Sequence, residues 1–161
     1  MLLFAACLLA GPVIPETLEQ RVADVLRLTP LVDGHNDIPW TVRTRFNNRL
    51  EDLDFGSDLT RIEVPTHTDI PRLRRGQVGG QFWSVYVPIQ EYGGGSEYTQ
   101  LVIEQIDLVH RMVDRYADTF ELAYTAADVR RIHASGKIAS LIGIEGGHAI
   151  NDSLAVLRRM Y

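Results

Sequence analysis

The chain of 161 residues has 45% hydrophobic and 23% charged residues and a formal net charge of −5. These proportions are close to those of an average globular domain, and they exclude a disordered chain, which has fewer apolar residues and a larger net charge. The acidic balance gives no general electrostatic reason to bind nucleic acid, so we expect no such partner. The single cysteine, Cys7, excludes an internal disulfide.

An apolar run of nine residues, 2–10, opens the sequence and is followed by Gly11 and Pro12. A run of this length is typical of the core of a secretory signal peptide, and it is shorter than the ~18 residues needed to span a membrane. We therefore predict a signal peptide over residues 1–15, a domain over residues 16–161, and a secreted or cell-surface protein. No basic residue precedes the run, which leaves open a buried N-terminal segment and a cytoplasmic location.

The first predicted element is a helix over residues 17–28, because a capping box opens at Thr17 and Pro30 follows the apolar pattern. Residues 31–37 predict a short buried strand that runs into a polar loop. Residues 41–78 show no clean periodicity, so we expect a long segment with little regular structure or short helices. We expect its seven arginines to form a solvated face, with the gripping of a carboxylate as the alternative.

Strands and helices alternate in the second half of the chain. Aromatic and β-branched residues predict a strand over residues 81–87, and the nearly continuous apolar run 138–144 predicts a strand buried on both faces. Helical periodicity and capping residues predict helices over residues 96–116 and 125–136 and from residue 151 onward. The apolar face of the last helix includes Leu154, Leu157 and Tyr161.

This order of elements predicts an α/β fold with a parallel sheet. The three predicted strands cannot close a β/α barrel, which needs about eight. The helical pattern also continues up to Tyr161, so we expect the chain to be the N-terminal part of a larger protein.

Two of the predicted strands end in residue types that bind metals. His35 and Asp37 follow the first strand, and side chains two residues apart in an extended chain point to the same side. Glu145 ends the strand 138–144, where a lone buried carboxylate needs a metal, a cation or a proton. Functional residues of parallel α/β folds collect at the carboxyl ends of strands, which favours a shared divalent-metal site. The alternatives are that Asp37 caps the next segment and that Glu145 pairs with an arginine.

Three longer strings resemble the renal (membrane) dipeptidase family. They read LVDGHNDIPW at residues 31–40, VGGQFWSVY at residues 78–86 and ASLIGIEGGH at residues 139–148. The strings follow one another in the order of the family, and with shorter matches between them the resemblance covers about residues 18–161.

Members of this family are zinc metallopeptidases on an eight-stranded β/α (TIM) barrel, and they hydrolyse dipeptides. The resemblance implies that this chain forms the N-terminal portion of such a barrel, incomplete here, with two zinc ions per complete subunit. His35 and Asp37 would bind one zinc and Glu145 would bridge it to the second. A hydroxide between the two zincs would attack the peptide carbonyl of a dipeptide substrate. A homodimer and a lipid (GPI) anchor to the membrane are also implied for the full-length protein.

The other ligands of the family would lie beyond Tyr161, so we expect the chain alone to be inactive and poorly stable. A non-catalytic truncated product, binding metal weakly at most, is therefore an alternative. A third interpretation is another metal-dependent amidohydrolase, but such enzymes usually open with H-x-H rather than the H-x-D of His35 and Asp37.

Several residues near the predicted site have supporting or ordinary roles. Asp33 is expected to orient His35, and His148 to lie beside the metal site or at a helix entry. Trp40 is expected in the core, with a place in the substrate pocket as the alternative. Ordinary core, surface or packing positions are expected for Trp83, His67, His110 and His133.

Overall fold

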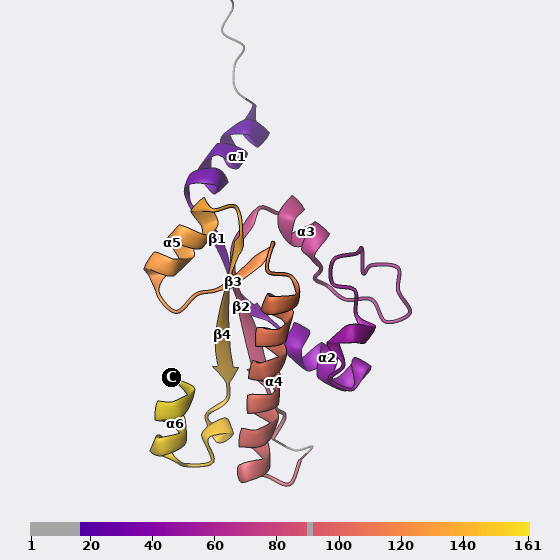
Figure 1. Cartoon of the computed structure of the whole chain (residues 1–161), viewed down its shortest axis with the longest axis vertical. Coiled ribbons are helices and arrows are strands. Elements are labelled where there is room, and N and C mark those ends of the chain that lie inside the picture. Colours follow the sequence, from indigo (N-terminus) through magenta and orange to yellow (C-terminus); the bar gives the residue numbers. More distant parts are fainter. Residues whose placement is uncertain (1–16, 90–91) are drawn as a thin grey trace, which may run out of the picture.

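The computed structural model describes residues 17–89 and 92–161 (Figure 1). The predicted signal peptide, residues 1–15, lies outside the described residues. The helices are α1 (Leu18–Leu28), α2 (Ile38–Phe46), α3 (Ile70–Arg75), α4 (Ser96–Arg115), α5 (Ala126–Ala134) and α6 (Leu154–Met160), with 3-10 turns η1 (Leu50–Asp52) and η2 (Gly147–Ile150). The strands are β1 (Leu31–Asn36), β2 (Val78–Tyr86), β3 (Phe120–Leu122) and β4 (Ile138–Glu145).

The four strands form one parallel sheet in the order β1-β2-β4-β3, which confirms the predicted α/β class. In its register, Asn36 lies beside Trp83, and Tyr86 lies beside Glu145. The carboxyl ends of β1, β2 and β4 therefore meet along one edge of the sheet. The prediction of three strands missed β3, whose three residues are too few to show a strand period.

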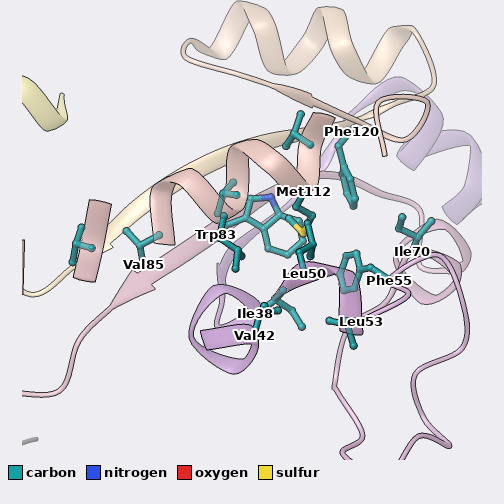
Figure 2. Close-up of a cluster of buried hydrophobic side chains, with 14 of the residues drawn as sticks. Ile38, Val42, Leu50, Leu53, Phe55, Ile70, Trp83, Val85, Met112 and Phe120 are labelled. Carbon is teal, nitrogen blue, oxygen red and sulfur yellow. The ribbon is translucent and has the colours of Figure 1, made fainter. Parts of the chain in front are cut away.

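The main hydrophobic core lies on one face of the sheet, between β2 and helices α2 and α4. Trp83 of β2 is fully buried, as predicted, and its ring makes edge-to-face contacts with Phe55 and Phe120. Figure 2 shows these three rings together with Met112 of α4 and Leu50 of η1. The core therefore holds β2 in place, and β2 is the middle one of the three strands whose carboxyl ends form the shared edge.

Residues 41–78 contain the predicted short helices, but much of the segment is packed into the core. Its buried side chains include Val42, Leu50, Leu53, Phe55, Leu59, Ile70 and Leu73. Apolar residues in this segment follow no single period because it turns repeatedly, so spacing alone could not reveal their burial.

The prediction that the arginines of this segment form a solvated face is wrong for two of them. Arg72 donates from Nε to the fully buried carboxylate of Asp69 at 2.7 Å, and Arg43 donates to Glu104 at 2.6 Å. Burial raises the pKa of Asp69, but hydrogen bonds from the main-chain N–H groups of Leu59 and Arg72 and from the Arg72 guanidinium outweigh it and lower the pKa overall. These arginines therefore fasten the segment to itself and to α4.

Two strands predicted to be buried are largely accessible. Leu31 and Val32 of β1 are 43% and 41% exposed, and in β4 only Ile138–Ser140 are buried. Among the described residues, β1 has a neighbouring strand on one side alone, which explains its exposure.

The first and last helices are also exposed. Helix α1 buries no residue and projects beyond the sheet (Figure 1). On α6, the predicted apolar face is present but exposed, with Leu154 at 63% and Leu157 at 45%. No helix within residues 17–89 and 92–161 is long and apolar enough to cross a bilayer.

Candidate metal centre

The end of β1 places two polar side chains side by side. His35 is the fifth residue of β1, and Asp37 stands at the N-cap position of α2, directly after the strand. The Asp37 side chain makes no capping hydrogen bond; its Oδ1 lies 3.1 Å from Nε2 of His35. Asp37 therefore occupies the N-cap position, but its side chain does not cap the helix.

Glu145 reaches the same place from β4. This residue ends β4 and is separated from β1 by β2, a gap of roughly 10 Å at normal strand spacing. The long Glu145 and His35 side chains close this gap, since Oε2 of Glu145 lies 3.5 Å from Nε2 of His35. One ligand atom from each of His35, Asp37 and Glu145 lies within 4.8 Å of the others.

The three side chains are open to solvent, with exposed fractions of 57% for His35, 58% for Asp37 and 46% for Glu145. The expectation that Glu145 is buried is therefore wrong, because β4 is uncovered at its carboxyl end. Within the described residues, Glu145 pairs with no arginine; its polar partners are His35 and Ser84.

This set of donors fits a divalent metal ion. One imidazole and two carboxylates are ligand types that zinc takes. Among the described residues, the ion pairs of these three side chains involve no lysine or arginine. Two carboxylates this close to each other also repel, which a cation between them would relieve.

The end of β1, which carries His35 and leads to Asp37, is held by the residue between them. Asn36 donates from Nδ2 to Oγ1 of Thr68 at 2.9 Å and to Oε1 of the fully buried Gln81 at 3.4 Å. Its Oδ1 accepts from the main-chain N–H of Ile38 at 3.2 Å. The sequence analysis missed Asn36, although a side chain with both donors and an acceptor between two predicted ligands was a usable signal.

Asp33 contacts the main chain of His35 rather than its ring, because Oδ1 of Asp33 accepts from the His35 N–H at 3.2 Å. Trp40 is partly buried and makes edge-to-face contacts with Tyr86 and Tyr92. Asp33 therefore supports the main chain at a predicted ligand, whereas Trp40 packs against two tyrosines and lies outside the main core where it was expected.

The other histidines lie outside the cluster of three. His148 sits in η2, the predicted helix entry, where its Nε2 is 2.7 Å from the carbonyl oxygen of Val87 and its ring packs edge-on against Tyr98. Nε2 of His133 is 3.2 Å from the carbonyl oxygen of Arg27. His67 is exposed, as predicted, and lines a cavity of about 540 Å³ that His35 and Asp37 also line.

Comparisons with known proteins show the family of this chain. The sequence model of the membrane dipeptidase family, peptidase family M19, matches residues 19–161. Dipeptidase ataJ of Aspergillus terreus is 43% identical over 152 residues, and dipeptidase verJ of Clonostachys rogersoniana is 38% identical over 155 residues. These matches cover 88% and 89% of this chain.

A solved structure is also similar in fold. It is a metallo peptidase from Rhodobacter sphaeroides, determined with a phosphinate mimic of the dipeptide L-Ala-D-Ala. The TM-score is 0.61 at 23% identity, and the match covers 83% of this chain and 43% of the other. Solved M19 dipeptidases are TIM-barrel metallohydrolases, so the four-stranded sheet corresponds to part of such a barrel.

The sheet and the family match therefore relate the chain to the class of α/β metallopeptidases. Within it, the chain belongs to the membrane dipeptidase family, M19. This membership excludes the alternative of a different amidohydrolase family. The chain spans 35% of the length of dipeptidase ataJ and 39% of the length of dipeptidase verJ.

Proposed function

We propose that this chain belongs to a zinc-dependent dipeptidase, in which His35, Asp37 and Glu145 are metal ligands. The observation that carries the proposal is the convergence of these three side chains within 4.8 Å, at the carboxyl edge of the sheet of an M19 family member. The carboxyl edge is also where parallel β/α folds place their active sites.

Zinc supplies two kinds of chemistry in hydrolases: it polarises a carbonyl as a Lewis acid and makes water nucleophilic near neutral pH. In this chain, the imidazole of His35 and the carboxylate of Asp37 would hold one ion. Glu145 has a second carboxylate oxygen and would bridge to another ion, as the family resemblance implies. The three residues account for one side of a two-ion centre.

The proposed substrates are dipeptides. Both curated relatives are named dipeptidases, and the similar solved structure holds a dipeptide mimic. The cavity of about 540 Å³ beside His35 and Asp37 has room for a molecule of that size. The polar side chains lining it include both a cation, Arg45, and an anion, Glu63, which suits the two charged ends of a dipeptide.

A second candidate function is metal binding without turnover by the chain as it stands. The exposed strand β1 and the uncovered carboxyl half of β4 favour it, because a site open to solvent weakens the electrostatic interactions that stabilise charge in a transition state. On this view, the complete two-ion centre needs residues beyond those of this chain.

One experiment tests the proposal and separates the candidates. Zinc binding is measured by isothermal titration on the parent chain and on His35→Ala, and L-Ala-D-Ala hydrolysis is followed on the zinc-loaded chain. We expect zinc binding that His35→Ala weakens by about 100-fold, without hydrolysis. Hydrolysis would support the full enzyme in this chain and exclude the second candidate. Equal zinc affinity of the two proteins would contradict both.

A further inference from the structure

Ser84 is a buried hydroxyl in the strand between the two ligand-bearing strand ends. It lies on β2, is 4% exposed, and is flanked by the apolar residues Trp83 and Val85. Its Oγ donates to Oε2 of Glu145 at 2.9 Å. The sequence analysis gave Ser84 no role.

The sheet register explains why this contact forms. Ser84 lies beside Gly143 of β4, and Glu145 lies two residues further along the same strand. Residues two apart on a strand point to the same face, so Ser84 and Glu145 are diagonal neighbours on one face of the sheet. Both also line a small cavity of about 250 Å³ together with His35.

The hydrogen bond fixes the oxygen atom that matters for the cluster. Oε2 of Glu145 both accepts from Ser84 and lies 3.5 Å from Nε2 of His35. A glutamate that is 46% exposed can adopt several rotamers, and most would carry the carboxylate away into solvent. Among the described residues, Ser84 is the partner that ties this carboxylate to a rigid and buried part of the sheet.

We propose that Ser84 is a positioning residue for the candidate metal centre, acting through Glu145. This inference rests on the proposed function, since it takes the cluster to be a metal site. The hydroxyl uses one lone pair of Oε2 and leaves Oε1 and the remaining lone pairs free for metal ions. By holding the carboxylate in place before the ion arrives, it reduces the conformational entropy lost on binding.

The test compares three variants in zinc and cobalt binding. Ser84→Ala removes the donor, Ser84→Thr keeps it, and Ser140→Ala removes a fully buried serine of β4 that instead accepts from Nε1 of Trp83 at 3.1 Å. Affinity is measured by competition with a chromogenic chelator, and the visible spectrum of bound Co²⁺ reports the ligand geometry. We expect Ser84→Ala to lose about 10-fold or more in affinity and to shift the Co²⁺ spectrum. Ser84→Thr should restore both, and Ser140→Ala should match the parent chain.

Two results would overturn the inference without touching the proposed function: parent-like affinity and spectrum in Ser84→Ala, or an equal loss in Ser140→Ala. If the parent chain and His35→Ala bind zinc equally, the proposed function fails. Metal-free crystal structures of the parent chain and Ser84→Ala separately test whether Ser84 holds the Glu145 carboxylate in place. The inference predicts that Glu145 moves away from His35 in the variant, and an unmoved carboxylate would overturn it.

Discussion

The packed face of the sheet and its carboxyl edge follow different rules. Around Trp83, aromatic and aliphatic side chains are fully buried and satisfy one another by contact (Figure 2). At the edge, His35, Asp37 and Glu145 are about half exposed and gather charges that repel. Contacts in the first region stabilise the fold, whereas those at the edge contribute little to stability until a cation binds. Substitutions in the two regions should therefore separate stability from metal binding.

The largest loss of stability is expected at Trp83. Trp83→Ala removes a fully buried side chain that contacts Phe55 and Phe120 and leaves a cavity in the core. We expect the free energy of unfolding to fall by about 3–5 kcal/mol, measured by urea denaturation. The exposed Tyr124, 78% accessible, is the matched control, and Tyr124→Ala should change stability little. Equal effects of the two changes would contradict the position of the core.

Asp69 should give the next largest effect. Asp69→Ala leaves the Arg72 guanidinium and the N–H of Leu59 without their acceptor, at a cost of about 2–3 kcal/mol.

The pH dependence of stability provides a second measurement on Asp69. Because its pKa is lowered in the folded chain, its contribution is complete above the unfolded value of about 3.9 and is lost as the pH falls from there through the folded-state value. Below about pH 4, the free energy of unfolding should therefore depend less steeply on pH in Asp69→Ala than in the parent chain. Parallel curves would contradict this role.

Two capping boxes give a smaller and more selective comparison. Thr125 caps α5, which buries Val129 and Ile132, whereas Thr17 caps α1, which buries nothing. Thr125→Ala should cost about 1 kcal/mol in global unfolding, and Thr17→Ala should leave it unchanged. A loss of similar size for Thr17→Ala would show that α1 packs on the domain in solution.

The smallest effect on stability is expected at the edge. Glu145→Gln keeps the size of the side chain and removes one of two close negative charges, so stability should change by less than about 0.5 kcal/mol. Zinc affinity should fall by about 100-fold, measured by chelator competition. Asp152→Asn, a change at an exposed acid of the 151–153 turn, is the control and should bind zinc like the parent chain.

The sequence predicted the class of fold and the strand ends where polar residues gather. Apolar runs such as residues 138–144 indicate a strand, so β2 and β4 could be located, although only Ile138–Ser140 of that run are buried. The exposure of β1 could not be read, because an apolar strand looks the same at the edge of a sheet as in its middle. The roles of His35, Asp37 and Glu145 as ligands remain predictions, now supported by their proximity.

The supporting roles of Ser84 and Arg72 could not be recognised from the sequence. Ser84 is one polar residue among apolar ones, and its value depends on the register that places Glu145 diagonally across from it. Arg72 belongs to a run of arginines, and the fully buried Asp69 that it contacts looks in sequence like any surface acid. Contacts of this kind depend on where neighbouring elements lie in space.

The most direct test of the central claim is the anomalous scattering of zinc in crystals of the chain grown with Zn²⁺. The account predicts a zinc peak bounded by Nε2 of His35 and the carboxylates of Asp37 and Glu145. A peak only at other residues, such as His67 or His133, or no peak at saturating zinc, would contradict it.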